Sequence, residues 1–240
     1  MPTILAIETT SEFCCVALRY QNVESHLYSD VKNSHADMLL TLVNRLLSNA
    51  GISLKQVDVI GLVVGPGSFT GIRIGLSMAQ GLAYGLSIPV VCINKLELLA
   101  QTALTHKSLD PHRPILVATD ANMGDVFWQG FDVITNSASA VAGLELTTKP
   151  SATKIDAAQI YFNESYSGTN YVGDAFTKGK LLLNEGKSID VTLDQICESL
   201  LVLTEQKLAV GEAVSAFDIE PLYIRTEITW KKRERIRETL

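Results

Sequence analysis

The sequence predicts an α/β protein that is built from two similar halves. The first half contains three strand-like segments followed by helix, strand, helix and strand, which is the order of a mixed sheet flanked by helices. The second half restarts with the same opening: a strand that ends in an acidic residue, a turn and a second strand. We therefore expect two units of the same kind in tandem.

The strands of the first half are predicted from their apolar patterns. Residues 3–8 and 13–20 are apolar runs, whereas residues 23–28 alternate between apolar and polar side chains. Residues 57–64 form the continuous apolar run that is typical of a buried parallel strand. Residues 89–93 supply a further apolar strand.

Three helices are expected between and after these strands. The first begins at Ser34 with a capping-box pattern and stops at Gly51, which predicts a helix over 34–50. The second covers residues 72–86 and is rich in small side chains. The third begins at Lys95.

The second half is less clear after its first two strands. Residues 115–120 and 125–131 read as strands that echo the start of the chain. The pattern weakens after about residue 135, where only residues 171–173 and a helix over 193–208 stand out. The segment 106–114, with its two prolines, is the natural boundary between the halves. The predicted domains are a first lobe over 1–106, a second and reduced lobe over 107–210, and a C-terminal segment over 211–240 that returns to the first lobe.

Three meandering strands followed by helix–strand–helix–strand are typical of a ribonuclease H-like unit. Two such units in tandem resemble the actin, Hsp70 and sugar-kinase superfamily, here with a shortened second copy. In that superfamily a nucleotide lies between the lobes, so the resemblance directs attention to the two hairpins that would hold phosphates.

The most informative stretch is the turn between the strand 57–64 and the helix that follows it. It reads Gly-Pro-Gly-Ser-Phe-Thr-Gly-Ile-Arg-Ile-Gly over 65–75. The spacing of its glycines excludes the dinucleotide fingerprint and the Walker A loop, and Pro66 excludes the nucleophile elbow. The loop residues that we single out are Gly65, Pro66, Gly67, Ser68, Phe69, Thr70, Gly71 and Arg73.

This turn resembles the signature of the TsaB (YeaZ) family, which takes part in threonylcarbamoyladenosine synthesis on tRNA. The opening strand and hairpin over 4–11 resemble the same family, as does Ser-His-Ala-Asp-Met-Leu-Leu over 34–40. Further similarity lies in the hairpin 120–128, in Glu-Pro-Leu-Tyr-Ile-Arg over 220–225 and in the Trp-Lys-Lys that follows at 230–232. These motifs cover almost the whole chain in the family order.

The resemblance implies a non-catalytic scaffold or activator subunit. Such a subunit acts with TsaD and TsaE in transferring threonylcarbamoyl from threonylcarbamoyl-adenylate to an anticodon-loop adenosine of tRNA. It implies a heterodimer with TsaD, a homodimer in the absence of TsaD, and contact with tRNA through the complex. The expected location is the cytoplasm, because no apolar run reaches the ~18 residues of a membrane helix and no export signal is evident.

The phosphate hairpins are only partly equipped for a nucleotide. The first reads Glu8-Thr9-Thr10-Ser11, without the glycine that lets a phosphate approach the backbone. Thr9, Thr10 and Ser11 are weak cofactor-binding candidates, and a hydrogen-bonded turn is the preferred interpretation. The second hairpin keeps Asp120 and a glycine. We expect no cofactor of the chain's own, although a nucleotide at an interface shared with a partner stays open.

Catalytic equipment is not recognisable either. The metal site of TsaD-type proteins needs two histidines four residues apart on one helix, and no pair of histidines here has that spacing. His35 lies in a predicted helix, whereas His106 and His112 are expected in a solvated linker. The prediction is no catalytic residue and no metal ligand; an autonomous nucleotide-dependent phosphotransferase or a peptidase is the alternative.

Net charge limits direct binding to RNA. The formal charge is −6, which argues against a protein that holds RNA by itself through phosphate neutralisation. Residues 225–240 are the exception, with six basic and three acidic side chains. This tail is expected to be a solvated, partly helical segment, and direct tRNA binding through residues 225–237 is the alternative.

The two helices of the first half have features of an interface. Apolar residues of helix 34–50 cover an arc of roughly 200°, whereas a helix lying on one sheet needs only about 100°. Helix 72–86 carries two stripes of small residues, one continuing from Gly71 and one from Ser77, which predict close backbone approach on two sides, to the sheet and to a second helix. In the family that the chain resembles, these two helices form the partner interface. The predicted interface residues are His35, Met38, Leu39, Leu42, Arg73, Gly75, Met78 and Ala79.

Overall fold

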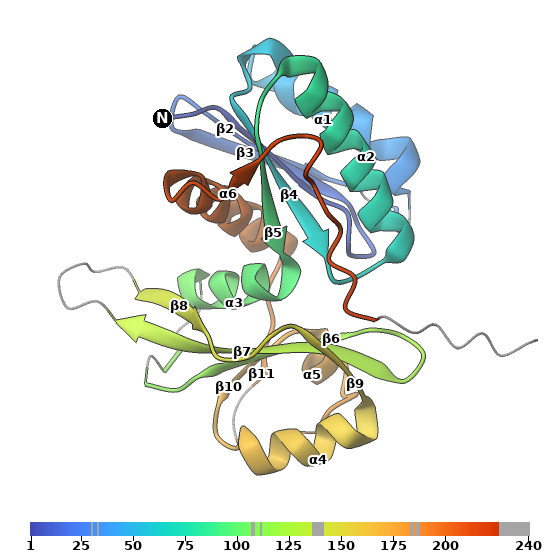
Figure 1. The fold of residues 1–240 in the computed structure, drawn as a ribbon, viewed down its shortest axis with the longest axis vertical. Coiled ribbons are helices and arrows are strands. Elements are labelled where there is room, and N and C mark those ends of the chain that lie inside the picture. Colours follow the sequence, from blue (N-terminus) through green and yellow to red (C-terminus); the bar gives the residue numbers. More distant parts are fainter. Residues whose placement is uncertain are drawn as a thin grey trace, which may run out of the picture.

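A computed structural model describes residues 1–29, 31–32, 34–106, 109–110, 112–135, 142–182, 185 and 188–225 of the chain. The molecule has two lobes, one above the other, and each lobe is built on one sheet (Figure 1). Among the described residues, no helix is long and apolar enough to cross a membrane.

The first sheet holds the strands of the N-terminal half. Its order is β12-β5-β4-β1-β2-β3, in which β1 pairs antiparallel with β2 and parallel with β4. The central strands are buried along their whole length, as their apolar sequences predict. The bounds are β1 Ile4–Glu8, β2 Cys15–Tyr20, β3 Val23–Tyr28, β4 Val59–Gly65, β5 Val90–Asn94 and β12 Ala213–Val214.

The second sheet repeats this arrangement with different residues. Its order is β11-β10-β6-β7-β8, and β9 pairs with β7 beside this path. Its first two strands form an antiparallel pair, and β10 joins the other side of β6 in parallel. The bounds are β6 Ile115–Asp120, β7 Asp125–Thr135, β8 Ala142–Leu146, β9 Ser151–Lys154, β10 Asn170–Val172 and β11 Ser188–Ile189.

The two sheets share one strand order. Counting strands from the start of each lobe and leaving out β9, which lies beside the main path, both sheets read 3-2-1-4-5 from one edge to the other, and β12 extends only the first. The prediction of two ribonuclease H-like units in tandem is therefore confirmed. The second copy is reduced in its later elements, because β10 and β11 have three and two residues.

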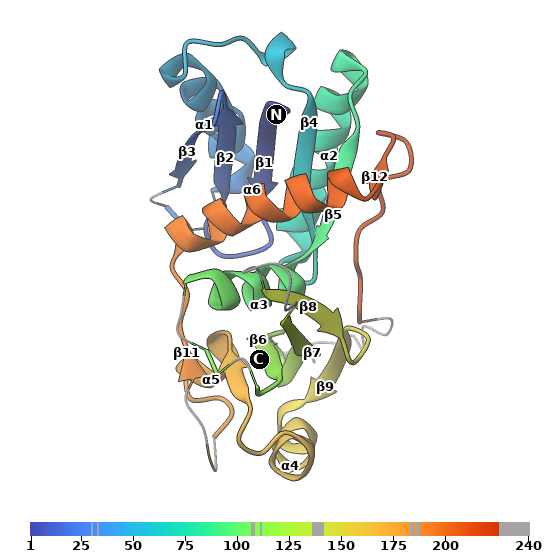
Figure 2. The same ribbon diagram turned by 90° about the vertical axis from the view of Figure 1, so that its left-hand side faces the viewer.

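The helices form layers around and between the sheets (Figures 1 and 2). α1 (His35–Asn49) and α2 (Phe69–Leu86) cover the outer face of the first sheet, and α6 (Leu193–Ala209) lies on its inner face. α3 (Lys95–His106) packs against α6 and against the second sheet. α4 (Ile155–Ser165) and the short α5 (Asp174–Thr177) cover the far side of that sheet.

The position of α6 differs from the prediction. The helix predicted over 193–208 was assigned to the second lobe. In the structure, its residues Cys197, Leu200 and Leu201 are buried against the first sheet. The structure also contains elements that were not predicted, namely β8, β9, β11, β12, α4 and α5. Which sheet a helix covers depends on long-range packing, and the local sequence pattern that would mark the missed elements is weak.

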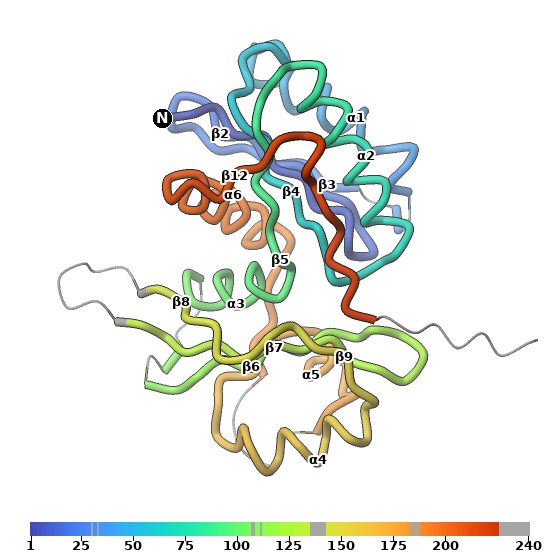
Figure 3. Tube along the Cα trace, in the orientation of Figure 1, coloured from blue at the N-terminus to red at the C-terminus, as the bar shows by residue number. Residues whose placement is uncertain are grey.

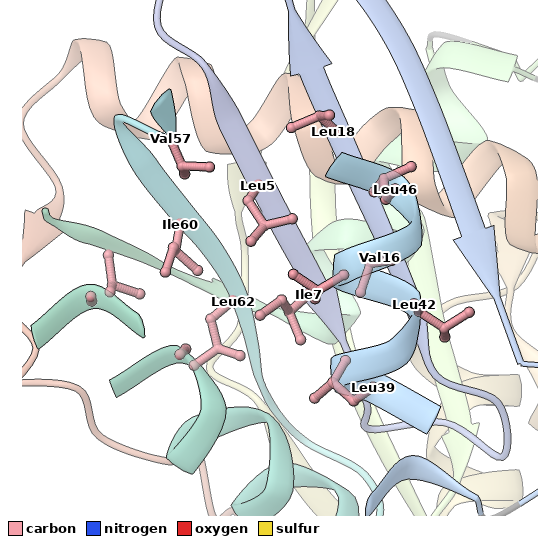
Figure 4. Close-up of a cluster of buried hydrophobic side chains, with 14 of the residues drawn as sticks. Leu5, Ile7, Val16, Leu18, Leu39, Leu42, Leu46, Val57, Ile60 and Leu62 are labelled. Carbon is pink, nitrogen blue, oxygen red and sulfur yellow. The ribbon is translucent and has the colours of Figure 1, made fainter. Parts of the chain in front are cut away.

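The outer core of the first lobe accounts for most of the apolar arc of α1. Leu39, Leu42 and Leu46 point at the sheet, where they pack among side chains such as Ile7 and Val16 (Figure 4). Leu40 is half exposed on the other side of the helix. The wide arc is therefore core rather than partner surface along most of the helix.

Local signals place the ends of α1 and α2 to within three residues. α1 begins one residue after Ser34, but the Ser34 side chain donates to the carbonyl of Val31 and does not cap the helix. α2 begins at Phe69, three residues before the predicted start, because Ser68 caps it. Part of the predicted glycine-rich loop is therefore the first turn of α2.

A C-terminal strap, residues 215–225, runs from β12 past the end of β4 towards the hairpin between β6 and β7 (Figure 3). The Leu222 amide donates to the carbonyl of Val64 at 2.8 Å, which fixes the strap to the first sheet. The strap thereby connects the two lobes at the side where α2 begins. The basic tail that follows, residues 226–240, lies outside the described residues.

Candidate functional site

The glycine-rich turn holds α2 against the first hairpin of the chain. Ser68 Oγ accepts a hydrogen bond from the Gly71 amide at 3.1 Å, and the Ser68 amide donates to the carbonyl of Thr10 at 2.9 Å. Gly65 and Pro66 are buried at the end of β4. The polar groups of the turn thus bind other parts of the chain.

Gly71 and Gly75 allow α2 to lie directly on Thr9. Thr9 Oγ1 donates to the carbonyl of Gly71 at 2.8 Å. A Cβ atom at Gly71 would lie 1.9 Å from the Thr9 carbonyl oxygen, and one at Gly75 would lie 2.3 Å from Thr9 Oγ1. One small-residue stripe therefore faces the sheet, as predicted.

The first hairpin is a hydrogen-bonded turn, which confirms the preferred interpretation of the sequence. Both the amide and the hydroxyl of Thr10 donate to the buried Glu8 carboxylate. Ser11 Oγ accepts from Lys95 Nζ at 2.9 Å. The cofactor candidates Thr9, Thr10 and Ser11 are thus engaged by the chain itself.

His35 supports the same hairpin from α1. It is buried, and its Nε2 lies 2.9 Å from the carbonyl of Ser11, so that this nitrogen carries the proton. Its Nδ1 has no hydrogen-bond partner among the described residues. The side chain positions the hairpin and does not reach the surface.

The second hairpin is closed by ion pairs. Asp120 binds Lys180, and the Asp120 amide donates to the Asp174 carboxylate at 2.8 Å. Partial burial raises the pKa of Asp120, but the Lys180 ammonium and the Asn122 amide outweigh this effect and leave the pKa below its ordinary value. The acidic residue that the superfamily uses near phosphates is therefore engaged by a lysine.

Replacing Lys180 by glutamine should lower the free energy of unfolding near pH 7 by about 0.5–1 kcal/mol, since the pair is partly exposed. A carboxyl with a lowered pKa stabilises the fold above its unfolded-state pKa and ceases to do so as the pH falls through its folded-state pKa. The difference between the two proteins should therefore shrink below about pH 4. Urea titrations at several pH values test this, and a difference that persists in acid would contradict it.

The remaining histidines do not gather into a site in the described structure. His106 ends α3 and lies 3.6 Å from Glu198 of α6, so its expected position in a solvated linker is wrong. His112 is exposed in the turn before β6, as expected. Within the described ranges, no group of three or more His, Cys, Asp or Glu side chains could hold a metal ion together.

An open groove runs along the outer face of α2. Its volume is about 690 Å³, and one wall comes from the start of α1. It has a floor of small side chains with apolar groups beside them, and Arg73 is the one charged residue among those that line it. The lining residues are Ala36, Phe69, Thr70, Arg73, Ile74, Ser77, Met78, Gly81 and Leu82.

The floor of the groove includes Ser77 and Gly81 of the second small-residue stripe. Ser77, Gly81 and Gly85 are exposed, and a Cβ atom at either glycine would meet no described atom within 4 Å. This stripe was expected to face a second helix. Within the lobe it faces open space, so a backbone from outside could approach α2 closely here.

The predicted interface residues divide into two groups. The prediction is wrong for five of the eight, because each is buried inside the lobe: His35, Leu39, Leu42, Gly75 and Ala79. The pattern of small and apolar residues does not tell which face of each helix meets the sheet, and these five are on that face.

Of the other three predicted residues, two line the groove. Arg73 and Met78 line it, and Met38 is half buried at the edge of the first core. Of the signature loop, Phe69 and Thr70 also line the groove. These residues remain candidates for contact with a partner.

One end of the groove is built by aromatic and cationic side chains. The Arg73 guanidinium lies 3.7 Å from the centre of the Phe69 ring, and its Nε donates to the Tyr223 hydroxyl at 3.1 Å. The Phe69 and Tyr223 rings are 5.4 Å apart. The strap therefore lies against one end of the groove.

Comparison with known proteins places this arrangement in a family. A protein from Haemophilus influenzae named "tRNA threonylcarbamoyladenosine biosynthesis protein TsaB" is 31% identical over 238 residues, which cover 96% of each chain. The chain belongs to the TsaB family. The TsaB protein of Escherichia coli is also 31% identical, over 95% of this chain and 97% of its own length.

Structure and a related family agree with this assignment to TsaB. The structure described as YeaZ from Pseudomonas aeruginosa superposes with a TM-score of 0.73 at 27% identity, over 93% of this chain and all of the other. The family model described as "TsaD: tRNA N6-adenosine threonylcarbamoyltransferase" matches residues 29–200. The chain is therefore related in sequence to TsaD as well.

Some residues of this TsaB site were not predicted. Ile74, Ser77 and Gly81 line the groove on the outer side of α2. The small-residue stripe that starts at Ser77 is the sequence signal that could have indicated Ser77 and Gly81, whereas Ile74 is not part of it. Tyr223 lies in the C-terminal motif 220–225, which by itself predicts no contact with α2. Its contact with α2 spans 150 residues of sequence, so no local pattern reveals it.

Proposed function

We propose that the chain is a non-catalytic subunit of the machinery that makes threonylcarbamoyladenosine in tRNA, and that it acts by binding TsaD through the α2 groove. The observation that carries the proposal is the exposed stripe of Ser77, Gly81 and Gly85 on a helix whose opposite face is already packed. Exposed apolar grooves with few charges are typical of docking surfaces, since a partner that fills the groove removes its apolar surface from water.

The composition of the groove fits a protein partner better than a polar ligand. Aromatic residues, methionine and arginine are enriched at interface cores, and the groove contains Phe69, Met78 and Arg73. It contains no acidic residue, although the whole chain has a net charge of −6. Small side chains on the floor would allow a partner helix to pack at short interaxial distance.

Relatedness to TsaD supports that protein as the partner. Two proteins with a common fold can pair around an approximate two-fold axis, in which equivalent surfaces meet each other. The same geometry would join two copies of this chain when TsaD is absent. We therefore expect a heterodimer in the complex and a homodimer of the isolated chain.

In this proposal the reaction takes place on the partner. TsaD supplies the metal and the active site that transfers threonylcarbamoyl from its adenylate to the tRNA adenosine, and TsaE is the third component. This chain stabilises the active arrangement of TsaD by binding it preferentially, which needs no catalytic residue here. Its contact with tRNA is made through the complex.

The isolated chain should bind ATP weakly, because the groups of the first hairpin are engaged by Glu8, Gly71 and Lys95. A nucleotide phosphate needs free amides or cations at such a hairpin. Calorimetry on the purified chain tests this. Micromolar or tighter affinity for ATP would overturn the expectation, whereas binding that arises only in the complex would assign the nucleotide to a shared interface.

The proposal as a whole is tested by co-purification with TsaD and by reconstituted modification of tRNA with and without this chain. The expected result is a stable heterodimer and modification that requires the chain. Full modification in its absence would contradict an activating role. Turnover by the chain alone that a point change abolishes would favour the autonomous enzyme instead.

A further inference from the structure

The hairpin between β6 and β7 presents an exposed methionine in an unusual backbone conformation. Asn122, Met123 and Gly124 have φ values of 57°, 57° and 81°. Asn and Gly are common in this left-handed region, but a long side chain such as Met is not. Met123 is 71% exposed, so little of its side chain packs inside the chain to compensate.

The strap holds this hairpin in place. The Arg225 guanidinium pairs with Asp125 and donates to the carbonyls of Ala121 (3.4 Å) and Asn122 (3.3 Å). Its Nη1 also lies 3.6 Å from the sulfur of Met123. Backbone strain persists where surrounding contacts fix it, and such positions are concentrated at functional sites.

The strap connects this hairpin to the α2 groove. Phe69 and Arg73 line the groove and touch Tyr223, which stands two residues before Arg225. Phe69 and Tyr223 remain 47% and 40% exposed. From the groove, the strap leads over Tyr223 to Arg225 and Met123, and so passes from the first lobe to the second.

The groove alone is too small for a stable heterodimer. Nine residues line it, whereas a stable interface uses roughly 20–30 residues on each side. The partner must therefore cover neighbouring surface, and the strap lies directly against one end of the groove.

We propose that the TsaD-binding surface extends from the α2 groove across Tyr223 to Met123, so that the second lobe contributes a methionine anchor to the same partner. This rests on the proposed function and adds to it a contact in the second lobe. The partner surface facing Met123 would be apolar, because methionine is a flexible apolar side chain that adapts to such surfaces.

The test measures the affinity of TsaD from the same organism for Met123→Asp. Aspartate accepts the left-handed region more readily than methionine, and the side chain is exposed, so the variant should fold and melt like the natural protein. Its affinity should fall at least about tenfold, as expected when a charge replaces an apolar contact. Leu182→Asp is the matched control, since Leu182 is 70% exposed beside α4, and should change affinity less than about twofold.

Gly81→Glu, measured in parallel, separates the two proposals. Unchanged affinity in Met123→Asp together with strong loss in Gly81→Glu would overturn the extension and leave the groove as the binding site. Unchanged affinity in both variants would overturn the proposed function with it. If Met123→Asp weakened self-association but not TsaD binding, a second copy of this chain would be the occupant, and the proposal would fail.

Discussion

Gly81→Glu should weaken binding to TsaD at least about thirtyfold, which corresponds to about 2 kcal/mol. Gly81 lies on the floor of the groove, and a glutamate there would fill the space that a partner backbone needs. It would also carry a negative charge into a desolvated interface, where the one lining cation, Arg73, is about two helical turns away and is held by Phe69 and Tyr223. Self-association of the chain should fall in parallel.

Folding should not be affected by this change. No described atom lies within 4 Å of a Cβ at Gly81, and glutamate has a higher helix propensity than glycine. Ala157→Glu places the same charge on an exposed position of α4 and should leave binding unchanged. Affinity by calorimetry and melting by circular dichroism measure both effects, and a folded Gly81→Glu protein that binds TsaD normally would place the interface elsewhere.

Gly71→Ala should destabilise the chain by about 3 kcal/mol, at the upper end of the cost of overpacking. The new methyl group would lie 1.9 Å from the Thr9 carbonyl oxygen and 3.0 Å from His35 Cδ2. A backbone oxygen cannot rotate away, so α2 would have to move off the hairpin. For a chain of this size, the melting temperature should fall by about 6–12 °C.

Gly85→Ala is the matched control on the same helix. A Cβ at Gly85 would meet nothing within 4 Å, so this change should stabilise the helix by up to about 1 kcal/mol. Calorimetric melting of both variants provides the comparison. Equal melting temperatures for Gly71→Ala and the natural protein would show that α2 does not lie on Thr9 as described.

The sequence predicted the fold of the first lobe well because its signals are local. The continuous apolar run of β4 and the glycine at the end of α1 mark an element and its limit without reference to the rest of the chain. The later half of the second lobe was not predicted, because its strands are short and α4 is only partly covered. The position of α6 depended on tertiary packing that no periodicity encodes.

The helices that form the candidate site were predicted, but most of the residues that line it were not. Both the small-residue stripes and the apolar arc directed attention to α1 and α2, and the groove lies there. Periodicity assigns residues to the faces of a helix but does not say which face meets the sheet. The prediction therefore places Leu39 and Ala79 at the interface, although both are buried in the core. The strap contacts of Tyr223 and Arg225 join segments 100 or more residues apart, which a single sequence does not reveal.

The central claim is that this chain acts through pairing and not through chemistry of its own. The most direct test titrates TsaD and TsaE with the chain and records the rate of tRNA modification, for the natural protein and for Gly81→Glu. We predict that the rate rises with the amount of heterodimer and that Gly81→Glu restores activity only in proportion to the heterodimer it still forms. Full modification by a folded Gly81→Glu protein that no longer binds TsaD would contradict the claim.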